Sequence, residues 1–493
     1  MKTIAQVLLL ALCFLFNQSK AQNYFNKRID LFGKADLTAN IFIDNNQYYV
    51  SGGGFNVAQT DISLSILKFD NDCNQLKETH NFQNNAWFYG GTTHGITKIN
   101  DSVLCTTGFR SGSTSMKGYL YWFKTNLDSI RYKEYGFINN DNAIYTQLLY
   151  ANKYHYLIGY TDSANTNQNI LLIKTDTAGN EIWKKKIGVT GMDENAYSID
   201  TLQGDLIIAG NRIIHNTSST DGFVMRIDTA GNTIWQKIIY TNGGYSGSKA
   251  KRLKDGNILV YSRLKMYDVG SDSYYKLKTE KITPNNITIW QKSYSSIGVE
   301  SDYYTALENS QGHIVIIGQK GYVDISVKGT VNVINQNGDS LFYKEFYNEQ
   351  GSQNYFRDMI QAPDKGYCFS GFIIPVVANG GTGTEDIWLL KVDSNFCESA
   401  VPCNNNVSVK ELVNDANWKV YPNPATNILN ITLETLYENA TINVMNMLGE
   451  VLQTNAITQQ HIVIDVSTFA GGIYFLTLQT KDIIVTKKII IEH

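Results

Sequence analysis

The sequence predicts an all-β protein with two folded parts joined by a linker, and three observations support this prediction. The chain of 493 residues holds 31 Tyr and 39 Gly but only 6 Pro, a composition that favours strands and tight turns over helices. Short strand-like segments recur at intervals of 51 to 53 residues over most of the chain. From Trp418 onward the pattern changes to short runs in which apolar and polar residues alternate, as in half-buried strands.

The N-terminus has the pattern of a secretory signal peptide. Lys2 supplies the positive charge, "IAQVLLLALCFLF" the apolar segment, and Ser19-Lys20-Ala21 a small-residue cleavage site before Gln22. We therefore expect residues 1–21 to be removed. The apolar run is shorter than the ~18 residues that a membrane span needs, and no other stretch approaches that length. A lipid anchor on Cys13 is disfavoured because Leu12, a large residue, precedes it.

Charge and cysteine content narrow the possible functions. The net charge is −3 without any Lys/Arg run, so the chain lacks the electrostatic footprint of a nucleic-acid-binding protein. The mature chain keeps five cysteines, and an odd number argues against a disulfide framework. Cys105 and Cys368 occupy matching places in strand-like segments and are expected in the core. Cys397 and Cys403 are candidates for a disulfide, although spacing alone does not distinguish a bond from two thiols.

Two elements alternate through the repeat region. The first is a strand-turn-strand hairpin, found seven times from "SILKFDNDCNQLKE" to "IWLLKVDSNF". The second is a turn leading into an apolar strand, found seven times from "NNQYYVSGG" to "APDKGYCFSG". Its glycine recurs at Gly108, Gly159 and Gly210, in steps of 51, and at Gly318 and Gly371, a step of 53.

A repeat of this length built of short strands is typical of a β-propeller blade. We therefore predict a seven-bladed β-propeller over residues 22–396. The array begins with a lone second element, Asn45–Gly53, and ends with a lone hairpin, Ile387–Phe396. We expect these two halves to complete one blade, which would close the ring and hide its sheet edges.

The pentapeptide D-T-A-G-N occurs at Asp176–Asn180 and again at Asp228–Asn232. Asp at the first turn position and Gly at the fourth predict a type I turn followed by a left-handed glycine. Trp183, Trp235 and Trp290 follow at matching places and are expected to fill the space between blades. A cation site in the turn would need alternating carboxylates, so the motif is interpreted as scaffold.

No local motif assigns chemistry to the repeat region. "DNDCNQ" at Asp70–Gln75 begins like a calcium loop but lacks its glycine and its closing Glu, which favours a polar hairpin turn. "NGGTGTED" at Asn379–Asp386 leads into a strand rather than a helix, so it is interpreted as a flexible loop. The seven histidines show no metal-binding spacing, and there is no G-x-S-x-G elbow. Catalytic residues therefore stay unknown, and neither a cofactor nor a metal is predicted.

The C-terminal part is predicted as a small domain behind a linker. Residues 397–417 are polar and Asn-rich, which indicates a linker. In residues 418–493, Leu429, Ile431 and Leu433 alternate with Asn430 and Thr432. Such strands with turns between them predict an antiparallel, immunoglobulin-like β-sandwich.

This segment resembles the C-terminal sorting domain of the type IX secretion system of Bacteroidetes. Four blocks carry the resemblance: "YPNPATNILNI", "INVMNMLGEVL", "GIYFLTLQT" and "TKKIIIEH". The resemblance implies export across the outer membrane by the secretion machinery, removal of the domain, and release or anchoring at the cell surface. The expected sorting-motif residues are Tyr421, Pro422, Asn423, Pro424, Gly472, Tyr474, Lys487 and Lys488. The repeats also resemble propeller repeats that such domains carry as cargo.

Two hypotheses remain for the propeller. The first is a non-catalytic module that binds an extracellular glycan or protein through its loops. The second is an enzyme of glycosidase, lyase or lactonase type with its site at the mouth of the central channel. Converging carboxylates or histidines there would favour the enzyme, and Ser, Asn and small apolar residues would favour the binder.

Overall fold

The computed structural model describes residues 23–56, 58, 60–83, 86–91, 94–112, 115–136, 142–162, 167–215, 220–241, 247–267, 273–294, 300–321, 326–376, 383–399, 418–433, 440–446, 451–479 and 484–492. The chain divides at Cys403 into two compact units, the ring unit and the tail unit, each described here by itself. All regular structure in the described residues is β-strand. None of the described residues forms a helix of the length and apolar character needed to cross a membrane.

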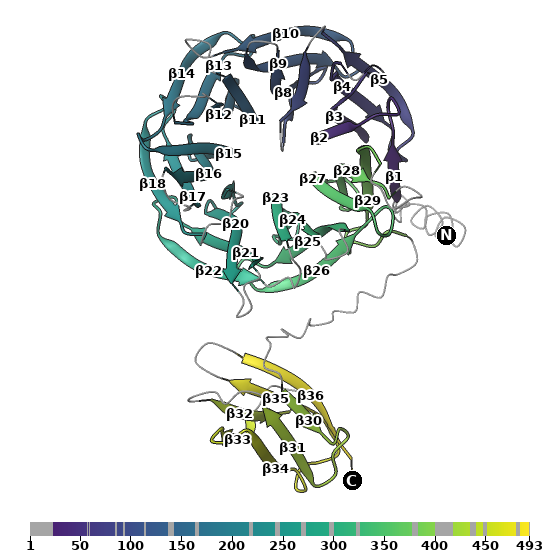
Figure 1. Ribbon diagram of the computed structural model, residues 1–493, viewed down its shortest axis with the longest axis vertical. Helices are drawn as coiled ribbons and strands as arrows, with labels where there is room; N and C mark the ends of the chain where they lie inside the picture. The colour runs from purple at the N-terminus through teal and green to yellow at the C-terminus, as the bar shows by residue number, and fades with distance from the viewer. Residues whose placement is uncertain are drawn as a thin grey trace, which may run out of the picture. The chain divides into compact units, whose positions relative to one another are not determined.

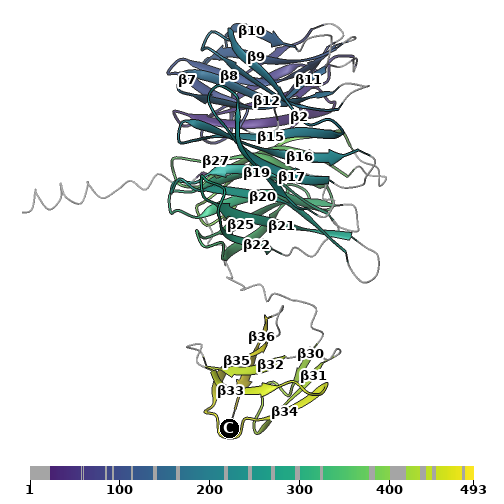
Figure 2. The same ribbon diagram turned by 90° about the vertical axis from the view of Figure 1, so that its left-hand side faces the viewer.

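The ring unit is a β-propeller whose sheets are arranged around a common axis (Figure 1). Its described strands form seven groups, which we call blades one to seven: five separate sheets and the two halves of an eight-stranded sheet. Blades six and seven share that larger sheet through a parallel contact between Val327 and Gln353. Seen from the side in Figure 2, the inner strands run along the ring axis.

Each blade has four strand positions from the axis outward. The first position holds β2 (Asp36–Asp44), β6 (Trp87–Gly90) with β7 (Ile96–Asn100), β11 (Asn142–Ala151), β15 (Met192–Leu202), β19 (Lys249–Arg252), β23 (Glu300–Glu308) and β27 (Gln353–Gln361). The second holds β3 (Gln47–Gly54), β8 (Val103–Ser111), β12 (Tyr154–Asp162), β16 (Asp205–Ile214), β20 (Ile258–Tyr267), β24 (Ile314–Gly321) and β28 (Tyr367–Ile374).

The two outer positions hold the predicted hairpins. The third holds β4 (Leu64–Phe69), β9 (Met116–Lys124), β13 (Ile170–Thr175), β17 (Thr220–Ile227), β21 (Ser273–Ile282), β25 (Val327–Ile334) and β29 (Asp386–Val392). The fourth holds β5 (Gln75–Asn81), β10 (Ser129–Tyr135), β14 (Glu181–Ile187), β18 (Thr233–Ile239), β22 (Thr288–Tyr294), β26 (Ser340–Phe346) and β1 (Phe25–Ile29).

The predicted mode of ring closure is wrong. The second element at Asn45–Gly53 belongs to blade one, which is complete in itself because β2 precedes it and β4 and β5 follow. Ile387–Phe396 supplies only the strand β29 and a turn, and the N-terminal strand β1 pairs with β29 as the outer strand of blade seven. The sequence reading missed this because "FNKRI" is short and its partner lies over 350 residues away.

The recurring glycine of the second strand has a steric reason. A Cβ at Gly210 would lie 1.8 Å from the Asn195 carbonyl oxygen of the neighbouring inner strand, and Gly318 and Gly371 are equally confined. At this level the inner strands carry a bulge, with register shifts at Ala196/Ser198, Tyr303/Thr305 and Phe356/Asp358. A glycine therefore lets the second strand approach the bulged backbone.

The D-T-A-G-N turns form as predicted. Gly179 and Gly231 have φ of 81° and 83°, and the Asp176 side chain accepts a hydrogen bond from the Asn180 N–H at 2.8 Å. The tryptophans lie between blades, and each indole donates to a carbonyl in the hairpin turn of the next blade. The pairs are Trp183 with Thr229, Trp235 with Pro284 and Trp290 with Gln336.

The buried core lies between neighbouring blades. The second and third strands bury both faces, and their apolar side chains from adjacent blades form shared clusters. Cys105 and Cys368 are fully buried thiols, as expected, and Cys73 is a third. Cys397 is disulfide-bonded. Its predicted partner Cys403 lies outside the described residues, so the pairing stays a prediction.

The tail unit consists of two antiparallel sheets. One contains β30 (Trp418–Tyr421), β31 (Ile428–Leu433) and β34 (His461–Asp465), and the other β33 (Val451–Ala456), β32 (Thr441–Met445), β35 (Gly472–Gln479) and β36 (Ile484–Ile491). The predicted alternation holds, because Leu429, Ile431 and Leu433 are buried in a core shared by both sheets.

Candidate functional site

Polar residues of the inner strands connect the blades around the ring axis. At several bulges the residue directly after the bulge accepts a hydrogen bond from a backbone N–H of the next blade. Gln147 Oε1 accepts from Ile199 at 2.7 Å, Ser198 Oγ from Ala250 at 2.9 Å, and Asp358 Oδ2 from Ile41 at 3.3 Å. The bulge therefore turns one side chain of the inner strand toward the neighbouring blade.

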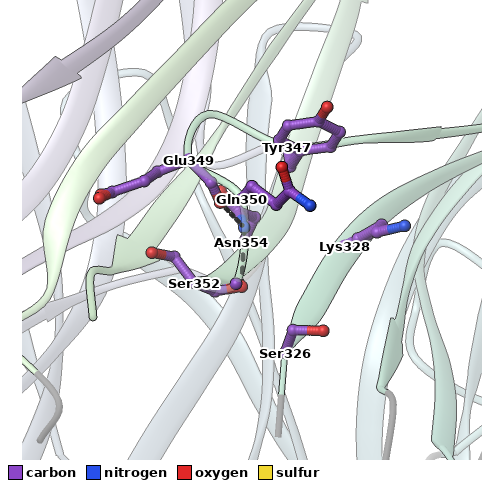
Figure 3. Close-up of a pocket in the computed structure, with 8 residues that line it drawn as sticks. Ser326, Lys328, Tyr347, Glu349, Gln350, Ser352 and Asn354 are labelled. Carbon is purple, nitrogen blue, oxygen red and sulfur yellow. Dashed lines mark hydrogen bonds between the residues drawn. The ribbon is translucent and has the colours of Figure 1, made fainter. Parts of the chain in front are cut away.

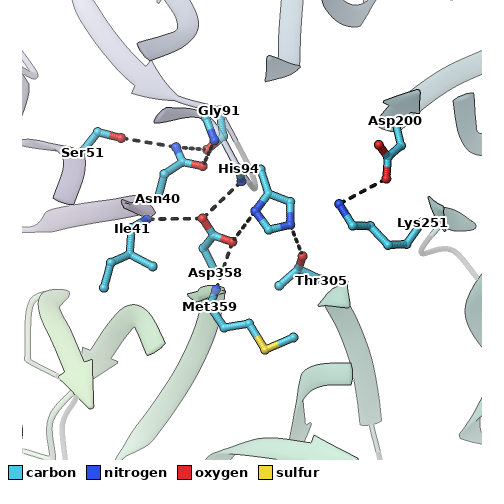
Figure 4. Close-up of polar contacts among 11 residues, drawn as sticks. Asn40, Ile41, Ser51, Gly91, His94, Asp200, Lys251, Thr305, Asp358 and Met359 are labelled. Atoms are coloured by element: carbon cyan, nitrogen blue, oxygen red, sulfur yellow. Dashed lines mark hydrogen bonds and ion pairs between the residues drawn. The ribbon is translucent and has the colours of Figure 1, made fainter. Parts of the chain in front are cut away.

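His94 extends from blade two to blades six and seven (Figure 4). It lies between β6 and β7, with a φ of 47°. Its Nε2 is 2.8 Å from Thr305 Oγ1 of β23, and its Nδ1 is 3.3 Å from Asp358 Oδ1 of β27. The bonding fits a neutral imidazole that donates from Nδ1 to the carboxylate and accepts the threonine proton at Nε2.

Burial controls the protonation of this pair. Desolvation lowers the pKa of His94, and the charge of Asp358 opposes that effect. Burial likewise raises the pKa of Asp358. The charge of His94 and hydrogen bonds from the backbone N–H groups of Ile41, Met359 and His94 lower that pKa and so partly offset the effect of burial. The order of a hydroxyl, an imidazole and a carboxylate is that of a nucleophile, its base and the group that orients the base. However, Thr305 is only 2% exposed, so its hydroxyl is closed to a substrate.

Three further cationic side chains of the inner strands also have partners. Lys251 Nζ lies 3.1 Å from Asp200 Oδ2 across blades four and five (Figure 4). Lys249 donates to the Tyr303 carbonyl at 2.5 Å, and the Arg357 guanidinium lies 4.5 Å from the centre of the Tyr304 ring. Burial lowers the pKa of Lys249. The ring centre therefore contains converging histidine and carboxylates, but they satisfy one another.

A pocket of about 270 Å³ lies beside blades six and seven (Figure 3). It is lined by the start of β25 and by the connection from β26 to β27: Ser326, Lys328, Tyr347, Glu349, Gln350, Gly351, Ser352 and Asn354. Asn354 fixes the connection, because its Nδ2 donates to the Val327 and Ser352 carbonyls and its Oδ1 accepts from the Asn348 N–H.

The charges around the pocket are balanced. Lys328 Nζ lies 3.3 Å from Glu345, and Glu349 lies 3.9 Å from Arg28 of β1. Glu349 is the one carboxylate among the described residues that line the pocket. Tyr347 at the edge is 46% exposed, with Lys328 Nζ 5.9 Å from the centre of its ring, so part of the aromatic side chain is accessible to a ligand.

The sequence reading did not find either place. Thr305 and Asp358 lie 211 and 264 residues after His94, and no local spacing links His94 to either of them. The pocket likewise combines segments of two blades without a motif. Asp70, the first residue of the calcium-like stretch, accepts hydrogen bonds from the Asn74 N–H and side chain, so its carboxylate stabilises a hairpin turn.

The predicted sorting residues lie in the tail unit, and several of them meet its last strand. Asn423 donates to the Lys488 carbonyl at 3.1 Å and accepts from the Ile490 N–H at 2.8 Å. Lys487 Nζ donates to the Trp418 carbonyl at 2.7 Å, and the Tyr474 hydroxyl donates to Ala470. Tyr421, Pro422, Pro424, Gly472 and Lys488 are exposed.

Residues 419–492 match the family model of the secretion system C-terminal sorting domain. The chain thus carries a type IX sorting domain, as its four blocks predicted, and the protein is exported to the extracellular space or the cell surface. No curated protein sequence matches the chain.

Solved structures with a likeness to the ring unit include the polysaccharide lyase Uly1, at 8% identity and a TM-score of 0.44, over 77% of this chain and 94% of that one. The β-propeller domain of the Trilobed protease from Pyrococcus furiosus has 9% identity and a TM-score of 0.42, over 76% of this chain and 100% of that one. A protein of unknown function from Dyadobacter fermentans has 9% identity and a TM-score of 0.40, over 76% of this chain and 98% of that one.

Proposed function

We propose that the ring unit is a non-catalytic glycan-binding module that the sorting domain brings to the outside of the cell. The observation that supports this proposal is the pocket beside blades six and seven, which combines an exposed tyrosine with a lining of hydroxyl, amide and ammonium groups. Sugar rings present an apolar face and a rim of hydroxyls, and a tyrosine face with convergent polar groups complements both.

The charge balance of the pocket favours a neutral glycan. Lys328 is paired with Glu345 and Glu349 with Arg28, so an acidic sugar would find no uncompensated cation. The volume of about 270 Å³ is just below the range of about 300–1,000 Å³ typical of pockets that enclose a whole ligand. We infer that the pocket holds one sugar ring of a longer chain.

The pocket does not favour hydrolysis. Glycosidases generally use two carboxylates that flank the scissile bond, whereas the described lining has Glu349 alone. The remaining candidates for catalysis are His94, Thr305 and Asp358. The low exposure of Thr305 disfavours them, because a substrate could not reach its hydroxyl.

Binding of the purified secreted protein to neutral polysaccharides such as xylan, laminarin and starch tests the proposal, with alginate as the acidic comparison. We expect binding to at least one neutral glycan, and Tyr347→Ala to weaken it by at least about tenfold, or about 1.4 kcal/mol. Tyr240→Ala is the matched control, because Tyr240 is 66% exposed and lies outside the pocket. Equal loss in both variants, or preferred binding of alginate, would contradict the proposal.

A further inference from the structure

Three aspartates meet where the ring closes. Asp30 follows β1, Asp36 opens β2 and Asp386 opens β29. One carboxylate oxygen of each residue lies within 4.8 Å of the others. β1 and β29 belong to blade seven and β2 to blade one, so the cluster lies where the pairing of the N-terminal strand β1 with β29 closes the ring.

Two oxygens of this cluster have no hydrogen-bond partner although they are buried. Asp36 and Asp386 are both 0% exposed, and Oδ1 of each is unpaired. The Oδ2 atoms are bound, since that of Asp36 accepts from the Leu31 N–H at 2.6 Å and that of Asp386 from Arg28 Nε at 2.5 Å. A buried carboxylate oxygen without a donor or a cation costs free energy.

The cluster carries more negative than positive charge. Arg28 is the cation bonded to it, and Arg28 is also shared with Glu349 at 3.9 Å. With three carboxylates and one guanidinium, the carboxylates repel one another, and a further positive charge among them would relieve that repulsion.

We propose that Asp30, Asp36 and Asp386 form a binding site for one calcium ion that joins the two ends of the ring unit. All three donors are oxygens, which Ca²⁺ prefers, whereas Zn²⁺ favours nitrogen and sulfur ligands. Two oxygens bound to one Ca²⁺ ion at about 2.4 Å are at most about 4.8 Å apart, and the three carboxylate oxygens all lie within that distance of one another, so their spacing is compatible with a single ion. Mg²⁺ would require a tighter octahedral site with bonds of about 2.0–2.1 Å.

The proposed ion would act on ring closure. Asp30 and Asp36 flank the connection from blade seven to blade one, and Asp386 opens the strand that β1 covers. An ion that binds all three stabilises the folded ring in proportion to its occupancy, because the unfolded chain does not hold the carboxylates together.

The test uses the purified secreted protein, freed of metal with EDTA, desalted and then titrated with CaCl₂ in a calorimeter. We expect one ion per chain and a rise of several degrees in the Tm of the ring unit. MgCl₂ at the same concentration should raise the Tm less. Asp386→Asn and Asp30→Asn should each remove the binding isotherm and the Tm rise.

Asp30→Asn keeps the test valid if a buried variant fails to fold, because Asp30 is exposed and its neighbours need not repack. Asp70→Asn is the matched control, since Asp70 is an aspartate of a hairpin turn outside the cluster. It should retain full calcium binding. The inference is overturned if the wild-type protein shows neither heat nor a Tm rise at millimolar calcium, or if Asp30→Asn binds calcium as the wild type does.

Discussion

His94 and Asp358 are the residues through which the ring should respond to pH. Burial lowers the pKa of His94, so the folded protein holds a neutral imidazole at a pH at which the unfolded chain, near its ordinary value of 6.5, takes up a proton. The unfolded state then binds more protons, and folding stability falls as the pH decreases. The contribution of the neutral His94 to folding stability is fully present above about pH 6.5. It is lost as the pH falls toward the pKa of His94 in the folded protein.

We expect the Tm of the ring unit to fall between pH 7.5 and 5.5, and His94→Gln to reduce that slope. Each pKa unit between the two states corresponds to about 1.4 kcal/mol. His155, fully buried and likewise with a pKa lowered by burial, contributes with the same sign, so His94→Gln/His155→Gln should flatten the profile further. Burial raises the pKa of Asp358 and raises that of Asp36 to about 7, and both carboxyls act in the opposite direction. The assignment is therefore tested by the variant, and a pH slope of the Tm that is the same in His94→Gln as in the wild type would contradict it.

At the scale of elements, the hairpin turns can be tested by comparing two glycines that both have a positive φ. Gly179 has φ of 81° and Gly204 has φ of 93°, so alanine is strained at both by about 1–2 kcal/mol. A Cβ at Gly204 meets nothing within 4 Å, whereas at Gly179 it would lie 2.5 Å from Trp122 and 2.7 Å from the Tyr135 hydroxyl oxygen. The turn at Gly179 is therefore packed against the preceding blade.

We expect Gly179→Ala to lower the free energy of unfolding by about 1–3 kcal/mol more than Gly204→Ala, which is the cost of overpacking. Chemical denaturation of both variants and the wild type measures the difference. Equal losses would mean that the turn needs glycine for its φ alone and that Trp122 and Tyr135 readily move aside.

The elements that could be predicted are those whose signals are local. The D-T-A-G-N turn, the hairpins and the apolar second strands each carry their chemistry within a few residues. The inner strands were not predicted because a bulge interrupts their alternation of apolar and polar residues. Polar side chains such as Gln147 and Ser198 also form hydrogen bonds to the next blade. Ring closure and the group around His94 depend on residues hundreds of positions apart, so periodicity gives no information about them.

At the scale of the whole molecule, the cluster of Asp30, Asp36 and Asp386 likewise could not be predicted from local sequence patterns. Asp386 ends the stretch "NGGTGTED", which local reasoning interprets as a flexible loop. Its carboxylate becomes part of a candidate metal site only because the pairing of β1 with β29 places Asp30 and Asp36 next to it. The tail, in contrast, was recognised from the sequence because its four blocks are contiguous and ordered.

The division into two compact units leads to a prediction about export. A chain that ends at Asn417 keeps the predicted signal peptide and the ring unit but lacks the sorting domain. We expect this chain to cross the inner membrane, to fold in the periplasm and to stay there, because the signal peptide addresses only the inner membrane. The full-length protein should be found outside the outer membrane, shortened by removal of its tail.

Fractionation of cells that express each chain, with a periplasmic enzyme as the control for leakage, measures the outcome. Thermal melting of the truncated chain from the periplasmic fraction shows whether the ring unit is folded, which separates a failure of sorting from a failure of folding. Within the tail, Asn423→Ala removes two hydrogen bonds to the last strand, so it should weaken the tail unit and reduce export without changing the Tm of the ring unit. Equal amounts of truncated and full-length protein outside the cell would show that residues 418–493 are not needed for export.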